Sequence, residues 1–281
     1  MITNKKTSSG FEYLEIQNKS ATAKIALQGG HLFHYQQLGK KSLLWLSERS
    51  LFQTGKPIRG GIPLCWPWFG KHPRDSSLPQ HGFARISLFE LLESNEPDEK
   101  TTEILLQLRS STETLTLWPY QFQLLLRITI GPLLTVSLTT RNCDTKSFTI
   151  TSALHSYFSV SNINYVSVEG LDQTEYLDAL TGETKNQQGT IRISEEIDRV
   201  YQNTSPPFLL LDRDRTIRIA TEGSNSAVVW NPWKAKSMEM ADMEDDAYNS
   251  MLCIETANAR EDARRLAPGK EHTLQVTLMT L

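Results

Sequence analysis

The chain has 281 residues and a formal net charge of −3, with basic and acidic residues mixed along its length. It carries neither a basic stripe nor a basic tail, so we expect no nucleic-acid partner. No apolar run approaches the ~18 residues that span a bilayer, and no apolar segment follows the lysines near the N-terminus. We therefore expect no membrane partner and a cytoplasmic location.

Cysteine and acid spacing exclude several classes of site. The three cysteines, Cys65, Cys143 and Cys253, are far apart and form neither a disulfide framework nor a C-x-x-C pair. The acidic run over residues 239–246 lacks the spacing and glycine of a calcium loop, which favours a solvated loop. His72 and His81 lack zinc-motif spacing, and no P-loop, G-x-G-x-x-G or G-x-S-x-G motif is present. We expect no metal and no cofactor.

A hydrophobic period of two dominates the chain and is typical of strands with one buried face. Phe122, Leu124, Leu126, Ile128 and Ile130 illustrate it. In chain order, the predicted strands are Phe11–Gln17, Ala21–Leu27, His31–Leu38, Ile86–Leu92, Glu103–Arg109, Phe122–Ile130, Thr135–Thr139, Phe148–Val160, Tyr165–Val168, Thr190–Ile193, Phe208–Leu211, Thr216–Ala220, Ala227–Trp230, Met251–Glu255 and His272–Leu278.

Turn signals separate these strands. Gly131-Pro132 predicts a hairpin, and the four charged residues 212–215 predict a charged turn. The segment Ala235–Tyr248 is the one weak helical candidate, with a loop as its alternative. Many closely spaced strands and almost no amphipathic helices favour an all-β fold, a large antiparallel sandwich or barrel, and we expect residues 1–281 to form one domain.

Residues 57–70 and their continuation 79–85 predict an irregular, rigid loop, because they are rich in proline, glycine and tryptophan. The loop carries Arg59 and Arg85, whose guanidinium groups match the geometry of an oxyanion. It also carries Gln80 and His81. We interpret this loop as half of a pocket for a small anionic ligand. The alternatives are that both arginines form ordinary ion pairs, that His81 braces the loop, and that its tryptophans pack in the core.

Three further side chains are candidates for the other half of the pocket. His155 lies in a strand-like segment with little charge and is either a core histidine or a general acid or base. Glu255 closes an apolar strand, where burial would raise its pKa toward that of a useful base; the alternative is a rim carboxylate paired with Arg260. Asp198 lies in a segment that reads on its own as a charged loop.

These segments together resemble the aldose 1-epimerase (galactose mutarotase-like) superfamily, and within it the hexose-6-phosphate mutarotase (glucose-6-phosphate 1-epimerase) branch. The resemblance runs in the family's order over most of the chain. Its segments are Arg59–Pro63, Trp68–Gly70, Gln80–Arg85, Leu154–Phe158, Asp198–Tyr201, Val229–Trp233 and Cys253–Glu255. The resemblance implies a large antiparallel β-sandwich, in agreement with the period of two.

The resemblance also implies the roles of these residues in an isomerase. His155 matches the general acid that protonates the ring oxygen, and Glu255 matches the general base on the anomeric hydroxyl. The substrate-binding positions are matched by Arg59, Gln80, Arg85 and Asp198, with the arginines near the 6-phosphate, and His81 falls near a histidine used by galactose mutarotases. The expected reaction interconverts the anomers of a hexose 6-phosphate, glucose 6-phosphate first, in a monomer.

Two other functions remain open at this point. A mutarotase for unphosphorylated hexoses would not require the pair Arg59 and Arg85. A carbohydrate-binding or sensor protein without activity would suit the sandwich and the aromatic loop, but it would not require both His155 and Glu255.

Overall fold

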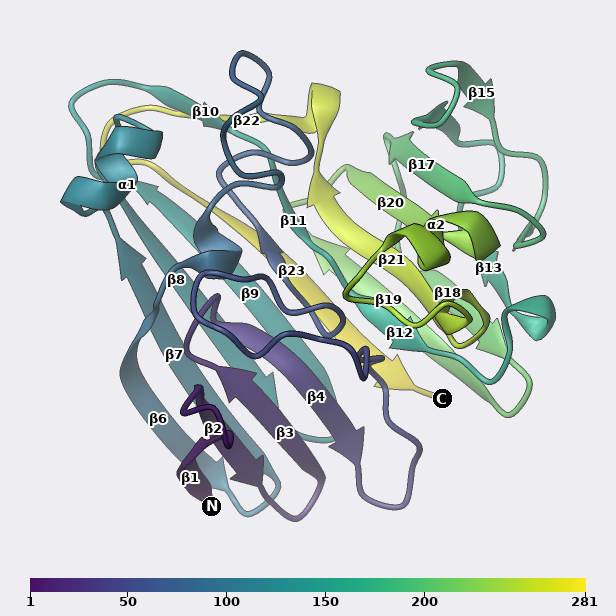
Figure 1. Ribbon diagram of the computed structural model, residues 1–281, viewed down its shortest axis with the longest axis horizontal. Helices are drawn as coiled ribbons and strands as arrows, with labels where there is room; N and C mark the ends of the chain where they lie inside the picture. Colours follow the sequence, from purple (N-terminus) through teal and green to yellow (C-terminus); the bar gives the residue numbers. More distant parts are fainter.

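The computed structural model describes residues 1–281. It consists of antiparallel strands with few helices, which confirms the predicted all-β class (Figure 1). The two α-helices are α1 (Thr112–Leu117) and α2 (Trp233–Glu239). No helix reaches the length and apolar character needed to cross a membrane.

The largest sheet has nine strands. Their order is β16 (Ile191–Arg192), β13 (Ser167–Glu169), β18 (Phe208–Asp212), β19 (Arg215–Glu222), β23 (Glu271–Thr280), β9 (Leu134–Asn142), β8 (Phe122–Ile130), β7 (Thr101–Arg109) and β6 (Glu90–Asp98). The predicted hairpin at Gly131-Pro132 joins β8 to β9, and the charged turn over residues 212–215 joins β18 to β19.

Three further sheets complete the sandwich. A four-stranded sheet contains β1 (Ile2–Lys6), β2 (Glu12–Gln17), β3 (Ala21–Ala26) and β4 (His31–Gln37). An eight-stranded sheet runs β15 (Thr184–Asn186), β14 (Glu175–Asp178), β17 (Ile197–Gln202), β20 (Ser226–Asn231), β21 (Met251–Asn258), β11 (Ser152–Leu154) and β5 (Leu64–Cys65), and β12 (Tyr157–Ser159) also pairs with β21. A two-stranded ribbon joins β10 (Phe148–Ile150) to β22 (Arg264–Leu266).

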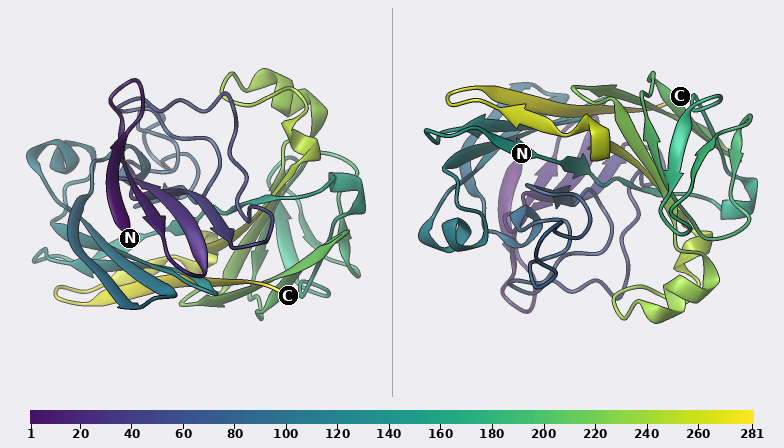
Figure 2. Two further views of the ribbon diagram at one scale, coloured as in Figure 1. Left: turned by 90° about the horizontal axis from the view of Figure 1, so that it is seen from below. Right: turned by 90° about the horizontal axis from the view of Figure 1, so that it is seen from above.

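The core lies between the nine-stranded sheet and the sheets stacked on it (Figure 2). Strand β3 packs against β8, while β11 and β21 pack against β23. One cluster of 54 buried residues fills this space, including Leu126 of β8, Val276 of β23 and Ile254 of β21. The period of two in the sequence is thus the alternation between this core and the opposite face of each strand.

Three local predictions were wrong. Residues 195–201, which read as a charged loop, contain strand β17, because Ile197 and Tyr201 alternate into the core. The predicted strand Ile86–Leu92 begins only at Glu90, after a 3₁₀ turn at Ala84–Ile86. The segment Phe148–Val160 is divided into three short strands, β10, β11 and β12.

The loop over residues 57–70 and 79–85 is irregular, as predicted, apart from the two-residue strand β5, and is held by close backbone packing. Gly82 has a φ of +73°, and a Cβ atom added there would lie 1.9 Å from the carbonyl oxygen of Trp66. Gly70 has a similar φ of +75°, but a Cβ atom there would meet no other atom within 4 Å. Of these two glycines, only Gly82 requires both the backbone conformation and the missing side chain.

This pair of glycines allows a matched test of the loop. Gly70→Ala should lower the free energy of unfolding by about 1–2 kcal/mol, the cost of an L-residue in the left-handed region. Gly82→Ala should cost roughly 1–3 kcal/mol more, because the added methyl group overpacks against Trp66. Urea denaturation of both variants measures the difference. Equal destabilisation by the two substitutions would show that the contact with Trp66 does not constrain the loop.

Candidate active site

The candidate site lies on the face of the eight-stranded sheet that points away from the core. Along β21, Leu252 and Ile254 belong to the main core, so the alternate residues Cys253 and Glu255 face the other side. The register pairs Val228 of β20 with Glu255. We call this surface the site face.

The site face also receives the predicted residue Asp198. It is paired across β17 and β20 with Trp230, which is in turn paired with Cys253. Asp198 and Glu255 therefore lie in neighbouring rows of the same face. Small buried side chains, including Cys65 and Ala257, lie on the same face.

His155 reaches the site face from the connection between β11 and β12, both of which pair with β21. Its Nε2 lies 3.2 Å from Oε1 of Glu255. The two residues are only 8% and 1% exposed. Nδ1 of His155 and Oε2 of Glu255 have no hydrogen-bond partner although both atoms are buried. Each member of the pair thus has one buried polar atom without a hydrogen-bond partner in the protein.

Burial pushes the pKa values of this pair in opposite directions. Desolvation, and then the negative charge of Asp198, raise the pKa of Glu255 well above its usual value. Desolvation, and then His81, Arg59 and Arg85, lower the pKa of His155 well below its usual value. Burial therefore favours a carboxylic acid beside a neutral imidazole, and this pair holds one exchangeable proton.

His81 and its neighbours form the wall of the site next to His155. The ring centroids of His81 and His155 are 5.9 Å apart. His81 has a φ of +63°, and its backbone N–H donates to the carbonyl oxygen of Gly70 at 2.6 Å. Burial, and then the positive charges of Arg85 and Arg59, lower its pKa to about 3, so the ring is neutral. Its Nδ1 accepts from the backbone N–H of Gly70 at 3.2 Å, which leaves the proton on Nε2.

The two predicted arginines have different surroundings. Arg85 is half-buried and donates from Nη2 to the backbone carbonyl of Gln80 at 2.6 Å. Arg59 donates from Nη1 to the Tyr157 hydroxyl at 2.9 Å and forms an ion pair with Asp242, with Nη2 3.1 Å from Oδ2. Arg59 thus forms an ion pair, as the alternative stated, and this pair lies beside the candidate catalytic residues.

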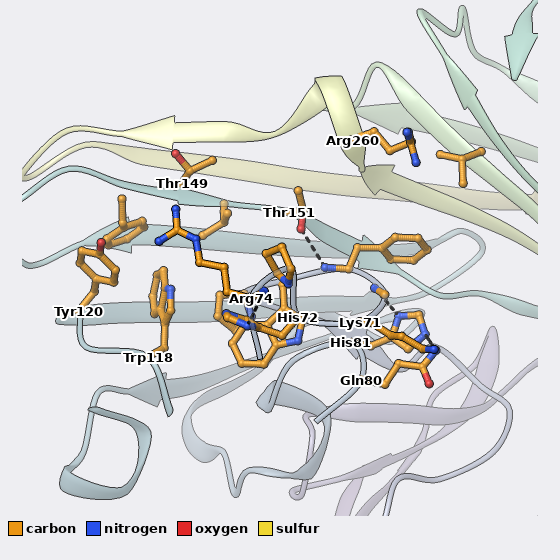
Figure 3. Close-up of a pocket in the computed structure, with 18 of the residues that line it drawn as sticks. Lys71, His72, Arg74, Gln80, His81, Trp118, Tyr120, Thr149, Thr151 and Arg260 are labelled. Carbon is orange, nitrogen blue, oxygen red and sulfur yellow. Dashed lines mark hydrogen bonds between the residues drawn. The ribbon is translucent and has the colours of Figure 1, made fainter. Parts of the chain in front are cut away.

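A cleft of about 890 Å³ adjoins the site. Its lining includes Gln80, His81 and Asp198, and it extends to Trp118 and Tyr120 on the far side (Figure 3). His155 and Glu255 do not line this cleft but lie buried beside it, next to His81. Gln80, His81 and Asp198 therefore connect the open cleft to the buried pair.

Three residues of the site were missed by the sequence analysis. Tyr157 stacks on His155, with ring centroids 4.7 Å apart and an angle of 10° between the planes. Trp230 packs edge-to-face with the same imidazole, with ring centroids 6.1 Å apart. Asp242 belongs to the acidic run that was predicted to be a solvated loop, which was wrong at this position.

The tryptophans and arginine named as alternatives also have definite places. Trp66 and Trp68 are buried in the core, as the alternative stated, and Trp68 also lines the cleft. Arg260 is exposed and forms no ion pair with Glu255, whose partner is His155.

The solved structure of a mutarotase-like protein has the same fold. The protein, a "putative mutarotase" from Salmonella typhimurium, superposes with a TM-score of 0.93 and 32% sequence identity, over 99% of this chain and 93% of that one. The match defines a mutarotase-like antiparallel β-sandwich.

Sequence comparison gives the family. The aldose 1-epimerase family model matches residues 12–279. A protein of Cenchrus ciliaris named "Putative glucose-6-phosphate 1-epimerase" is 37% identical, over 97% of this chain and 86% of its own. A protein of the same name from Escherichia coli K12 is 34% identical, over 98% of this chain and 92% of its own. The chain belongs to the aldose 1-epimerase family.

The electrostatics of Asp198 predict a stability cost at the site. Burial, and then the charges of Glu196 and Asp178, raise its pKa from 3.8 to about 6. Its ionised form is therefore disfavoured in the folded protein, and this cost is complete above about pH 6 and vanishes as pH falls to the unfolded pKa. Asp198→Asn should raise the free energy of unfolding at pH 7.5, by on the order of 1–3 kcal/mol, with a smaller gain at pH 5.

Asp178 provides the control, because its ionisation should stabilise the folded protein where that of Asp198 destabilises it. Burial opposes ionisation there too, but hydrogen bonds from Lys185 and from backbone N–H groups dominate and lower its pKa. Asp178→Asn should therefore reduce stability at pH 7.5. Urea denaturation of both variants at the two pH values tests this, and a loss of stability in Asp198→Asn at pH 7.5 would contradict it.

Proposed function

We propose that the protein interconverts the α and β anomers of a hexose 6-phosphate, with glucose 6-phosphate as the first candidate. The observation that carries the proposal is the buried contact of 3.2 Å between His155 and Glu255, in which each residue keeps a polar atom without a partner. Membership of the aldose 1-epimerase family and the names of the relatives support the same activity.

The proposed reaction needs only proton transfers. Glu255, as a carboxylate, accepts the proton of the C1 hydroxyl, and protonated His155 donates to the ring oxygen as the C1–O5 bond breaks. The product is an open-chain aldehyde, which rotates about C1–C2 and presents its other face. Closure reverses both transfers, because neutral His155 takes the O5 proton and the Glu255 acid returns one to O1. Such groups typically contribute ~10²–10⁴-fold each.

The proton count of the pair suits this cycle. Ring opening converts a carboxylate and an imidazolium into a carboxylic acid and an imidazole, which is the neutral form that burial favours. Ring closure restores the charged form. Both forms hold one exchangeable proton, so the cycle needs no proton from bulk water, and a shift across the contact between His155 and Glu255 prepares either form.

The surrounding residues are proposed to bind the sugar phosphate. Arg59 and Arg85 supply positive charge for the 6-phosphate, a part of the substrate that does not react. Asp198, Gln80 and His81 lie where the open cleft meets the buried pair, so we assign them to the sugar hydroxyls. Binding of the phosphate then fixes the position of C1 relative to His155 and Glu255.

Two alternative functions would give different results when the relaxation of sugar anomers is measured with and without the protein. A mutarotase for unphosphorylated hexoses would accelerate only free sugars, and a sugar sensor would bind without acceleration. Cytoplasmic location, the monomeric state and the single domain over residues 1–281 stay predictions.

The catalytic assignment predicts a large loss of rate without unfolding. Freshly dissolved α-glucose 6-phosphate should relax to its anomeric equilibrium faster with the protein than in buffer alone, as followed by NMR. Glu255→Gln should lower kcat at least ~10²-fold, because the amide cannot accept the proton, while the denaturation midpoint changes little. Near-normal turnover in this variant would remove Glu255 from the mechanism.

The phosphate assignment predicts selective losses of affinity. Arg59→Ala and Arg85→Ala should each raise KM for glucose 6-phosphate by about 10- to 100-fold, as expected when a charge-assisted hydrogen bond of about 1.5–3 kcal/mol is lost. KM for free glucose should change much less. Equal losses on the two sugars would show that these arginines do not bind the phosphate.

A further inference from the structure

Arg59 is held at both its backbone and its side chain. Its backbone N–H donates to the Ser50 hydroxyl at 2.8 Å, and its carbonyl accepts from the backbone N–H of Ser47 at 3.0 Å. Its side chain contacts Tyr157 and Asp242. The short segment 47–50, which we call the brace, therefore fixes the position of the Arg59 backbone.

The brace also holds the loop that carries Asp242. The Glu244 carboxylate accepts from the hydroxyl of Ser47 at 3.1 Å, from the backbone N–H of Glu48 and from that of Arg49 at 3.2 Å. The Arg49 guanidinium donates to the Met243 carbonyl at 3.0 Å. Arg59 and Asp242 are thus positioned by one common segment, although they lie 183 positions apart.

Hydrophobic packing also holds the loop that carries Asp242. Met243 is fully buried, in a cluster with Trp45, Tyr157 and Cys253. Trp45 and Tyr157 stack with ring centroids 5.8 Å apart, and Tyr157 stacks in turn on His155. The residue next to Asp242 is therefore packed against the ring that supports the catalytic histidine.

The hydrogen bonds that Arg59 already makes determine which of its N–H groups can bind a ligand. A guanidinium has five N–H donors. Nε donates to Oδ2 of Asp242 at 3.2 Å, Nη1 donates to Tyr157, and Nη2 lies 3.1 Å from the same Asp242 oxygen in the ion pair. Further N–H groups on the two terminal nitrogens remain for a ligand. Because the Arg59 and Asp242 side chains are only 21% and 22% exposed, this arrangement is partly shielded from water.

We propose that Asp242 is a positioning residue, which orients Arg59 so that N–H groups on its terminal nitrogens bind the phosphate of the substrate. The proposal rests on the proposed function. Asp242 should also weaken phosphate binding, because its carboxylate lies close to the phosphate dianion that Arg59 binds and repels it. Orienting Arg59 requires only an oxygen acceptor at position 242, whereas repelling the phosphate requires a negative charge there. The two contributions can therefore be separated by substitution.

Two substitutions at the same position provide the kinetic test. Asp242→Ala removes the acceptor and should raise KM for glucose 6-phosphate about tenfold, with kcat and KM for free glucose changing less than about twofold. Asp242→Asn keeps an oxygen for Arg59 and removes the charge, so its KM should equal or fall below that of the unaltered protein. Equal losses on both sugars, or equal effects of the two substitutions, would overturn the proposal.

A double-mutant cycle shows whether Asp242 acts through Arg59. The variant with both Arg59→Ala and Asp242→Ala should bind glucose 6-phosphate no worse than Arg59→Ala alone, since the positioned group is already absent. Additive losses would contradict this. The matched control is Glu239→Ala, which removes the same charge from an exposed pair with Lys236 and should leave KM unchanged.

A measurement without substrate separates this proposal from the activity. If no sugar relaxes faster with the unaltered protein, the proposed function fails, and the orientation of Arg59 is still observable in its Nε–H resonance by NMR. The resonance should be retained in Asp242→Asn and lost or averaged in Asp242→Ala. An unchanged resonance in Asp242→Ala would show that Arg59 is held without Asp242.

Discussion

Alternation along paired strands is the constraint on which the site depends. Strands β17, β20 and β21 of the eight-stranded sheet each place one face in the shared core, so their remaining residues are gathered on one outer face. Ile254 thereby fixes the direction of Glu255, and Ile197 and Tyr201 fix that of Asp198. The core therefore does more than stabilise the sandwich, because it aligns polar side chains from distant segments.

The same burial that aligns these side chains also sets their chemistry. Glu255 is disfavoured as an anion and His155 as a cation, so burial favours the neutral pair, in which Glu255 holds the proton. In the proposed reaction each residue gives and takes a proton within one cycle, which is possible because both forms of the pair hold one exchangeable proton. Arg59 and Arg85 contribute positive charge nearby without joining the proton transfers in the proposed reaction.

Charged residues in irregular segments have a structural role that complements the sheet. Glu244 satisfies backbone N–H groups of the brace, Arg49 spans from the brace to the acidic loop, and Asp242 meets Arg59. Strands alone would not place a guanidinium next to Tyr157 and His155. The irregular segments supply that position because their turns are fixed by side-chain hydrogen bonds.

The sequence by itself determined the all-β class, the longest strands and the unusual character of His155 and Glu255, because alternation and a charged residue in an apolar segment are local signals. It misjudged β17 and the acidic run, where both faces of a strand or both partners of an ion pair are needed to interpret the charges. Only the tertiary structure decided that Tyr157, Trp230 and Asp242 belong to the site. Their roles depend on contacts between segments far apart in the chain, and no local pattern encodes such contacts.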